Sequence, residues 1–411
     1  MTPLDEARSF VVGLGSKLGS VEVPVAEADG LVLVEDVVAS ELVPGDDNAA
    51  MDGWGLRSAD AAEPGATLRV VGRQMAGLAD PGLTVGPGEA VRIMTGAPIP
   101  AGVDAVEMVE RTSVSDGNDR NEAVTFELSV PVGQFIRRAG EDVSPGQRVL
   151  PAGTRLTPAA IGVAVSVGRR RVTVVRRPRV GVVSTGDELV TEDRPLRTGE
   201  LRDSNRPGLL AAVARMGAEA VDLGRVPDDE ALIEAALLRG AEDCDLVLSS
   251  GGVSMGDADL VKVILARLGD MRWMQVAIKP AKPLAAGTVG STPVVGLPGN
   301  PVSSHVSFML FAAPLIARLA GRNDPILRLR ATLVDGLAGR PAAEVNGRVD
   351  ERTHFTRVLV ESDDEGVWTA RSAGGQGSHQ LSTMALANGL ATQPGGVAIE
   401  PGAEATILML P

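Results

Sequence analysis

The chain has 411 residues, of which 44% are hydrophobic, and this indicates about two to four globular domains with large cores rather than a disordered chain. The formal net charge of −14 argues against a general surface for nucleic acid or anionic membranes, although it allows a small basic pocket for an anionic ligand. Aromatic residues make up only 2%, with no Tyr, so we expect no base stacking on aromatic platforms.

Cysteine content and hydropathy bear on the compartment. Cys244 is the only cysteine, which excludes an internal disulfide, and nothing around it indicates a thiolate metal site or a nucleophile. The first residues lack the basic region and apolar core of a signal peptide, so we expect a reducing cytoplasm. The longest uncharged run, 283–317, is broken by Gly and Pro. Its helical part after Asn300 is expected to be too short to cross a bilayer, so no membrane partner is predicted.

The first half of the chain changes from helical to β-rich. Apolar residues from Leu4 to Leu14 recur at spacings of three and four, which predicts an N-terminal helix. From about 31 to 175 the chain is rich in Val, Gly and Pro, and short apolar or alternating segments lie between Pro-Gly turns. This pattern predicts a β-rich region.

From about 178 to 322, apolar strands alternate with helical segments. Strands are expected at 180–184, 220–223, 246–249, 274–278 and 293–297. Helices are expected after Asn205, from a cap near Asp228 to Gly240, up to Gly269, and from Asn300 onward. This alternation predicts a doubly wound parallel sheet, whose ligands bind at the carboxyl ends of the strands. After about 325, alternating segments predict a small β-barrel or sandwich.

The segment 245–259 (DLVLSSGGVSMGDAD) is the most informative of the chain. It reads as a buried strand that ends in a Gly-rich loop, in which Gly251, Gly252 and Gly256 allow a sharp turn and a close approach of the backbone to a ligand. Backbone N–H groups of such a loop can hold an anion, and Asp257 and Asp259 could hold a divalent metal. The alternative is an ordinary βα turn with an Asp helix cap.

Polar or charged residues, together with Gly and Pro, follow each of the five predicted strands, so these residues are expected to lie together at one edge of the sheet. Glu188, Asp228 and Asp259 come from three of these loops and could together bind Mg²⁺ or place a water, although each could instead cap a helix or face solvent. Lys279 and Lys282 form a basic pair that suits an oxyanion or phosphate, the alternative being an exposed loop. The chain has no P-loop, His-Glu-x-x-His or opening Gly-x-Gly-x-x-Gly motif.

Several strings, spread over nearly the whole chain, carry a resemblance to a known family. They are 48–53, 94–100 with 104–106, 138–142, 184–188, 203–207, 249–259, 278–283, 296–301 and 376–379. In these strings the sequence resembles the molybdopterin molybdotransferases of the MoeA type and is similar to the E-domain of gephyrin.

The resemblance implies a multidomain α/β and β architecture in an elongated homodimer. A helical linking domain is expected at 1–44 and 141–177, and a β-rich domain at 45–140. A doubly wound parallel-sheet, molybdopterin-binding domain is expected at 178–322, and a C-terminal β-barrel at 323–411. The β-rich domain of one subunit is expected near the active cleft of the other, which would bring its residues into the same site as the acids of the α/β domain.

The implied activity is that of a molybdopterin molybdotransferase, an enzyme of molybdenum cofactor biosynthesis. It inserts molybdenum from molybdate into adenylylated molybdopterin, releases AMP, and uses Mg²⁺; an upstream molybdopterin adenylyltransferase is a possible partner. The resemblance assigns catalytic roles to Asp52, Glu188, Asp228 and Asp259, of which the last three are also the expected metal ligands. The expected substrate-binding residues are Thr95, Arg138, Asp142, Ser250, Gly251, Gly252, Ser254, Gly256, Lys279, Lys282, Pro298, Pro301, Arg357 and Ser378.

Three other interpretations stay open at this point: a stand-alone molybdopterin adenylyltransferase, a non-catalytic scaffold, and a transferase that inserts tungsten. Resemblance along the full length argues against the first, and the acids and lysines argue against the second. Trp54 stands where relatives usually have Tyr, and Gln275 stands where some have Lys, which puts one phosphate or molybdate contact in doubt.

Overall fold

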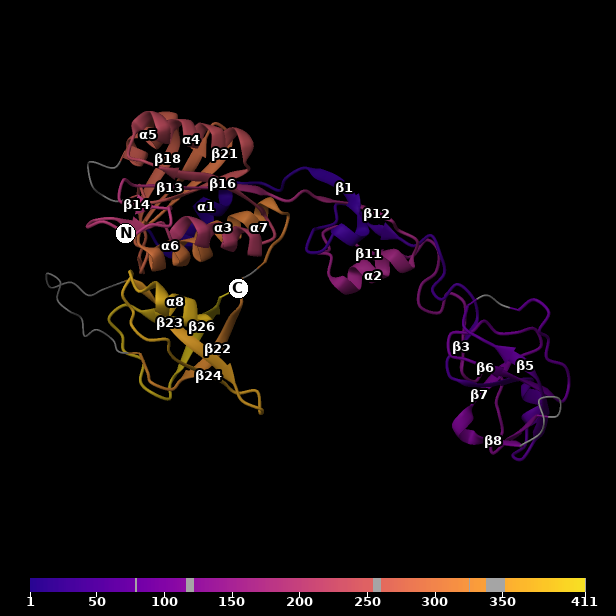
Figure 1. Cartoon of the computed structure of the whole chain (residues 1–411). Coiled ribbons are helices and arrows are strands. Elements are labelled where there is room, and N and C mark those ends of the chain that lie inside the picture. Colours follow the sequence, from indigo (N-terminus) through magenta and orange to yellow (C-terminus); the bar gives the residue numbers. More distant parts are fainter. Residues whose placement is uncertain (78–79, 116–121, 254–259, 325, 338–351, 411) are drawn as a thin grey trace. The chain divides into compact units, whose positions relative to one another are not determined.

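The computed structural model describes residues 1–77, 80–115, 122–253, 260–324, 326–337 and 352–410 (Figure 1). The chain forms two compact units. Unit 1 consists of Met1–Val21, Gly30–Val32 and Val174–Pro411, and unit 2 consists of Glu22–Asp29 and Leu33–Thr173. We describe each unit by itself.

Unit 2 is β-rich, as predicted. Its largest sheet has the order β7-β4-β6-β5-β9-β8, in which only β5 and β6 run parallel. The strands of this sheet are β4 (Gly53–Leu56), β5 (Thr67–Gln74), β6 (Glu89–Ile93), β7 (Ala105–Met108), β8 (Thr112–Ser115) and β9 (Ala123–Phe126). A Cβ atom at Gly53 would lie 2.0 Å from the carbonyl oxygen of Glu107, so only glycine lets β4 and β7 approach this closely.

Short elements complete unit 2. Antiparallel ribbons pair β2 with β11 and β3 with β10. Helix α2 begins with a Thr157 cap, whose hydroxyl accepts from the Ala160 N–H at 3.3 Å, followed by Pro158. The remaining bounds are β1 (Ser20–Pro24), η1 (Val25–Glu27), β2 (Val37–Val38), β3 (Asn48–Ala49), η2 (Ser58–Ala61), η3 (Val109–Arg111), β10 (Ile136–Arg137), β11 (Arg148–Leu150), α2 (Pro158–Ser166) and β12 (Arg171–Val175).

Unit 1 is built around a six-stranded sheet of order β16-β13-β17-β21-β20-β18. The strands are β13 (Arg179–Thr185), β16 (Glu219–Val226), β17 (Leu246–Ser250), β18 (Gly269–Gln275), β20 (Pro283–Val289) and β21 (Thr292–Leu297). The first four strands in this order are parallel, whereas β20 is antiparallel to both of its neighbours. The pattern of alternating strands and helices missed β20, because it joins β21 through a tight turn without a helix.

Helices cover both faces of this sheet (Figure 1). One face, with Leu246 and Leu248, packs on α1 (Leu4–Gly13), α3 (Asn205–Arg215) and the helical segment that starts with α6 (Pro301–Ser307). The other face, with Val247, packs on α4 (Glu230–Asp243) and α5 (Leu260–Leu268). Alternate strand residues therefore enter two cores, which is why this strand reads as continuously apolar. The cap of α4 is Asp229 and not Asp228, since its carboxylate accepts from the Leu232 N–H at 3.0 Å.

The predicted C-terminal barrel is also present. The strands β23, β24, β22, β26 and β25 pair in this order, and β25 pairs with β23 to close the ring. Their bounds are β22 (Arg328–Leu333), β23 (Thr353–Ser362), β24 (Trp368–Ser372), β25 (Gly389–Pro394) and β26 (Glu404–Met409), with α8 (Leu381–Leu386) between β24 and β25. Strand β19 (Ile278–Lys279) leaves the α/β region and pairs with β23. A short ribbon pairs β14 (Leu189–Val190) with β15 (Leu201–Arg202).

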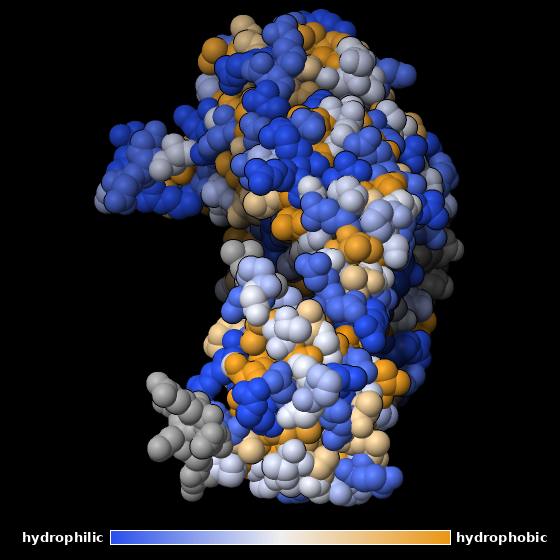
Figure 2. Space-filling view, turned by 90° about the vertical axis from the view of Figure 1, so that its right-hand side faces the viewer, coloured by the Kyte–Doolittle hydropathy of each residue, from blue (hydrophilic) through white to orange (hydrophobic). Residues whose placement is uncertain are grey.

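The helical segment after Asn300 is longer than predicted. Helix α6, the π-helical turn η4 (Phe308–Ala312) and α7 (Ala313–Leu319) follow one another without a break. The segment has 19 residues and is long and apolar enough to cross a membrane, contrary to the expected shortness, but 83% of its apolar window is buried inside the protein. Phe311 and Leu315 are fully buried in the core, so packing explains the composition. On the face drawn in Figure 2, hydrophobic residues lie singly or in small groups among hydrophilic ones.

Candidate active site

The predicted polar loops do lie along one edge of the sheet. Strands β13, β16, β17 and β21 are parallel, and β18 runs in the same direction because β20 is antiparallel to both β21 and β18. The loops after these five strands therefore leave the sheet at its carboxyl edge, where α/β sheets bind ligands. This confirms the arrangement that the positions of the polar residues predicted.

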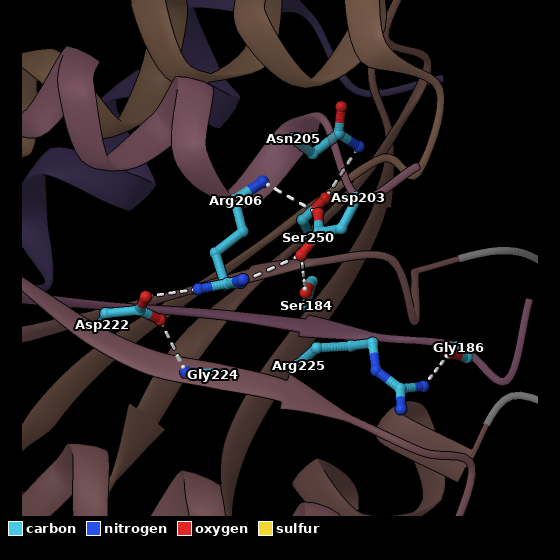
Figure 3. A network of polar contacts seen from close by, with 9 residues as sticks. All are labelled: Ser184, Gly186, Asp203, Asn205, Arg206, Asp222, Gly224, Arg225 and Ser250. Carbon is cyan, nitrogen blue, oxygen red and sulfur yellow. Dashed lines mark hydrogen bonds and ion pairs between the residues drawn. The ribbon is translucent and has the colours of Figure 1, made fainter. Parts of the chain in front are cut away.

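The loops with Glu188 and Asp228 adjoin. The Gly186 N–H donates to the Val226 carbonyl at 3.2 Å, and the Asp228 N–H donates to the Asp187 carboxylate at 3.0 Å. Arg225 adds a bond from its guanidinium to the Gly186 carbonyl at 3.3 Å (Figure 3). Two predicted acids thus come from neighbouring loops, and the Asp228 side chain is exposed. Asp259, the third acid, lies outside the described residues.

The chemistry of these loops suits Mg²⁺. Carboxylate oxygens are the ligands that this hard cation prefers, and it normally binds only one or two of them together with substrate phosphates and water. Glu188 and Asp228 each supply one carboxylate of this kind, from adjoining loops. Among the residues that the structure describes, no cluster of three or more His, Cys, Asp or Glu side chains could hold a metal ion.

A buried acid organises the start of α3. Asp203 accepts from the Ser184 hydroxyl at 2.6 Å and from the Arg206 Nε at 2.9 Å, and its side chain is only 2% exposed (Figure 3). Arg206 also forms an ion pair with Asp222 of β16. This network fixes α3 against the ends of β13 and β16. Asp203 and Arg206 lie in the string 203–207 of the family resemblance, which assigned them no role; a charged first turn after a predicted strand was the available signal.

Asn205 connects two loops at the carboxyl edge of the sheet. Its Nδ2 donates to the Ser250 hydroxyl at 2.9 Å and to the Gly299 carbonyl at 2.7 Å. Figure 3 shows the contact with Ser250, which ends β17. Gly299 belongs to the loop after β21, so one buried amide holds both loops in place. The Oδ1 atom of Asn205 is buried and has no hydrogen-bond partner among the described residues. An unsatisfied acceptor at this position is costly unless a ligand or water donates to it.

The first half of the Gly-rich loop has the predicted shape. Gly251 and Gly252 have φ values of +97° and +73°, and the Gly251 N–H donates to the Leu297 carbonyl at 3.0 Å. A Cβ atom at Gly252 would lie 2.3 Å from the Cβ of buried Val261, so the loop passes directly over α5. Ser254 and Gly256 lie outside the described residues.

The two predicted lysines line a cavity of about 820 Å³ between the loop after β18 and the barrel. Its polar lining also includes Ser378, which was predicted, and residues that sequence reasoning missed: Ser303, Asp335, Arg352, His354, Thr356 and Gln376. Ser303 lies on α6, and the other missed residues come from the barrel region, where local patterns do not show which side chains face the loop after β18. Pro298 is buried after β21 and Pro301 is the first residue of α6; neither is part of the lining.

Arg357 on β23 is buried, with 1% of its surface exposed. Its Nη2 donates to the carbonyls of Gly375 and Gly377 at 2.6 and 3.2 Å, and its backbone N–H donates to Gln376 Oε1 at 2.9 Å. Burial lowers the pKa of the guanidinium from its ordinary value. Its Nε is buried and has no partner among the described residues. In these contacts Arg357 shapes the loop that carries Ser378, whose carbonyl accepts from the Val302 N–H of α6 at 3.1 Å.

In unit 2, Asp52 and Thr95 contact each other directly. The backbone N–H and the hydroxyl of Thr95 both donate to Asp52 Oδ1, at 2.7 and 2.8 Å. These bonds, the backbone one first, lower the pKa of the exposed Asp52 carboxyl. Arg138 is paired with Asp47 at 2.6 Å, and the Asp142 N–H donates to the Val43 carbonyl at 3.0 Å. Arg138 is therefore engaged within its own unit, and Asp142 presents an exposed carboxylate.

Replacing Thr95 with Val should raise the pKa of Asp52 toward its ordinary value, because the hydroxyl bond is lost while the backbone bond remains. A lowered folded-state pKa stabilises the protein above the unfolded pKa, and this stabilisation is lost as the pH falls through the folded value. The Thr95→Val substitution should therefore reduce the amount of stability that Asp52 loses as the pH falls. Carboxyl ¹³C NMR titration of Asp52 measures the shift, with Thr67→Val as a control, since Thr67 bonds Thr125 instead. An unchanged Asp52 titration would contradict the assignment.

Cys244 is buried after α4, and this burial raises the pKa of its thiol to about 11. We expect a thiol reagent at pH 8 to leave the native protein unmodified and to modify one thiol after unfolding. Fast modification of the native protein would show that the thiol is accessible and ionised, contrary to the structure.

An open α/β sheet with a glycine-rich turn, carboxylates and a lysine-lined cavity at its carboxyl edge is an arrangement suited to an anionic ligand. The chain matches three family descriptions. Residues 2–168 match the MoeA N-terminal region (domain I and II), residues 181–318 the probable molybdopterin binding domain, and residues 348–410 the MoeA C-terminal region (domain IV).

Known proteins are similar to this chain along nearly its full length. The chain is 37% identical over 390 residues to the molybdopterin molybdenumtransferase of Haemophilus influenzae, covering 94% of this chain and 93% of the relative. It is 38% identical over 406 residues to molybdopterin molybdenumtransferase 2 of Mycobacterium tuberculosis, covering 96% of each chain. The crystal structure of the molybdopterin biosynthesis MoeA protein of Pyrococcus horikoshii superposes with a TM-score of 0.80 at 27% identity and covers 100% of both chains. The chain belongs to the MoeA family of molybdopterin molybdenumtransferases.

Proposed function

We propose that this protein is an enzyme of molybdenum cofactor biosynthesis that inserts molybdenum into molybdopterin. The observation that carries the proposal is the gathering, at one sheet edge, of a glycine-rich turn, two adjoining acids and a cavity lined by Lys279 and Lys282. Full-length similarity to two molybdopterin molybdenumtransferases supports it.

The proposed substrates are adenylylated molybdopterin and molybdate, and the proposed products are AMP and molybdenum cofactor. The Gly252 N–H would bind phosphate, because the Gly251 N–H already donates to the Leu297 carbonyl, and Asn205 holds Ser250 beside this loop. Lys279, Lys282 and Ser378 line the cavity that would take the molybdate dianion. Arg357 would hold the wall of this cavity through the loop at Gly375 and Gly377.

Glu188 and Asp228, together with Asp259, would hold Mg²⁺. When bound, the ion would neutralise charge on the pyrophosphate oxygens and favour departure of AMP. The protein's own contribution is positioning. The Asp187 carboxylate fixes the Asp228 backbone, and the Asp203–Arg206 network fixes the neighbouring helix, so the acids meet the substrate in a set geometry.

We propose that the protein is a homodimer in which four residues of unit 2 complete the site: Asp52, Thr95, Arg138 and Asp142. We also propose that it works in the cytoplasm and receives its substrate from an upstream molybdopterin adenylyltransferase. The dimer has a direct test. Mixing inactive Asp52→Ala and Asp228→Ala proteins should restore activity if each site uses residues of both subunits. A monomer by light scattering at micromolar concentration, or no restored activity after subunit exchange, would contradict a shared site.

The activity is tested by measuring AMP release from adenylylated molybdopterin, with molybdate and Mg²⁺ each added or withheld. We expect release that requires both. A folded protein that binds the pterin but releases no AMP under any condition would contradict the proposal and favour a scaffold. Substituting tungstate for molybdate in the same assay measures the preference between the two oxyanions.

A further inference from the structure

A second cavity, of about 960 Å³, lies between α1, the end of α7 and the start of β22. It shares no lining residue with the cavity at Lys279 and Lys282. Its charged lining consists of four arginines and one acid: Arg8, Arg318, Arg322, Arg328 and Asp324. Four guanidiniums around one cavity are unexpected in a chain with a net charge of −14.

Backbone carbonyls hold three of these arginines in place. Arg8 Nε donates to the Leu310 carbonyl at 3.2 Å, and Arg318 Nε donates to the Gly15 carbonyl at 2.6 Å. Arg322 Nη2 donates to the Met216 carbonyl at 2.6 Å. A carbonyl fixes the direction of a guanidinium without cancelling its charge, so these side chains are preorganised and still fully cationic.

Carboxylates compensate only part of this charge. Arg322 pairs with Asp324 at 3.3 Å, and Arg8 pairs with Asp5 at 3.2 Å, but Asp5 is 90% exposed and contributes little. Within the described ranges, Arg318 and Arg328 have no carboxylate within ion-pair distance. Arg8 Nη2 is buried and has no partner among the described residues. Burial lowers the pKa of Arg8, the Asp5 carboxylate raises it by less, and the nearby charge of Arg328 adds a smaller lowering effect.

Like charges that converge in a partly buried cavity repel each other, and an oxyanion would relieve this repulsion while bonding the buried donor. We propose that the cavity lined by Arg8, Arg318, Arg322 and Arg328 is a second anion site that binds a tetrahedral oxyanion, either free or as the phosphoryl group of a small molecule. This site does not depend on the proposed transferase activity, because its lining and its chemistry are separate from the carboxyl edge. The net acidic chain favours a small ligand over a polyanion such as nucleic acid.

The test compares two arginines on the same strand. Arg328 lines the cavity, whereas Arg330, two residues later, pairs with Glu404 on the surface and is not part of the lining. Neither Arg328→Gln nor Arg330→Gln removes a buried contact, so both variants should fold. Calorimetric titrations of the full-length protein at constant ionic strength would use inorganic phosphate in one arm and glycerol phosphate in the other.

We expect the wild-type protein and Arg330→Gln to bind the anion with the same stoichiometry and affinity. Arg328→Gln should lose one binding component or weaken it at least tenfold, equivalent to about 1.4 kcal/mol. Binding of inorganic phosphate alone would identify a free oxyanion, and binding of both probes would identify a phosphoryl group. Absence of any component sensitive to Arg328, or equal weakening in Arg330→Gln, would overturn the proposal. AMP release should be unchanged in Arg328→Gln, which separates this test from that of the transferase.

Discussion

Replacing Asp228 with Ala should slow AMP release by roughly 10²–10³-fold, the usual cost of removing one group that stabilises transition-state charge. The expected loss is catalytic and not structural. The Asp228 side chain is exposed, and the bond that joins its loop to Asp187 uses the Asp228 backbone N–H, which Ala retains. Single-turnover AMP release measures the rate, and thermal unfolding should leave the Tm within about a degree of wild type, because exposed substitutions of this kind change stability little.

The adjacent residue supplies a matched control. Asp229→Ala removes the same chemical group one position later, where the carboxylate caps α4 through the Leu232 N–H. We expect this variant to lose about 1 kcal/mol of stability with AMP release nearly unchanged. Full activity in Asp228→Ala, or an equal rate loss in both variants, would remove Asp228 from the mechanism.

Gly252→Ala should have the second large effect, on both stability and activity. The residue has a φ of +73°, which costs an L-amino acid about 1–2 kcal/mol, and the new Cβ would lie 2.3 Å from the Cβ of Val261. Relieving this overlap adds about 1–3 kcal/mol. The loop must move to do so, and a shift of about 1 Å in a phosphate-binding group lowers the rate by roughly 10²-fold. Denaturant unfolding and AMP release measure the two effects.

Gly290→Ala separates the two causes. Gly290 has a similar φ of +60° in the turn before β21, but a Cβ atom there meets nothing within 4 Å. This variant should lose only the stability that an L-amino acid loses at a positive φ, and its AMP release should be normal. The double variant Gly252→Ala/Val261→Ala should recover only a small part of the activity, since it removes the Val261 Cγ atoms at 2.5 and 2.7 Å but keeps the Cβ at 2.3 Å. If Gly252→Ala behaves like Gly290→Ala, the close approach of the loop to α5 is not important for function.

Local sequence patterns predicted much of the fold. The strand at Leu246 and the proline-led helix at Pro301 could be predicted because apolar spacing and turn residues depend on nearby sequence. For the C-terminal region, alternation predicted a barrel or a sandwich, and only the family resemblance implied the barrel. Strand β20 could not be predicted, because its segment of small residues and prolines lacks alternation and a following helix. The predicted α4 cap near Asp228 is confirmed as Asp229; two adjacent aspartates carry the same signal, and only the Leu232 contact distinguishes them. The domain bounds at 44, 140, 177 and 322 stay predictions.

The candidate site was predictable where one loop carries its chemistry and not where distant segments meet. The turn at Gly251 and the lysines near β19 stand out in the sequence. By contrast, the bond from Asn205 to Gly299 joins residues 94 positions apart. The burial of Arg357 depends on the barrel loop that surrounds it, so its carbonyl contacts could not be foreseen. The roles assigned through the family resemblance stay predictions for each single residue.

The most direct test of the central claim is the molybdenum content of the pterin product. Wild-type protein and Asp228→Ala would be incubated with adenylylated molybdopterin, molybdate and Mg²⁺, and the pterin would be isolated and analysed for metal by mass spectrometry. We predict stoichiometric molybdenum on the pterin with wild type and little with the variant over the same time. Pterin that stays free of molybdenum with the folded wild-type protein would contradict the account.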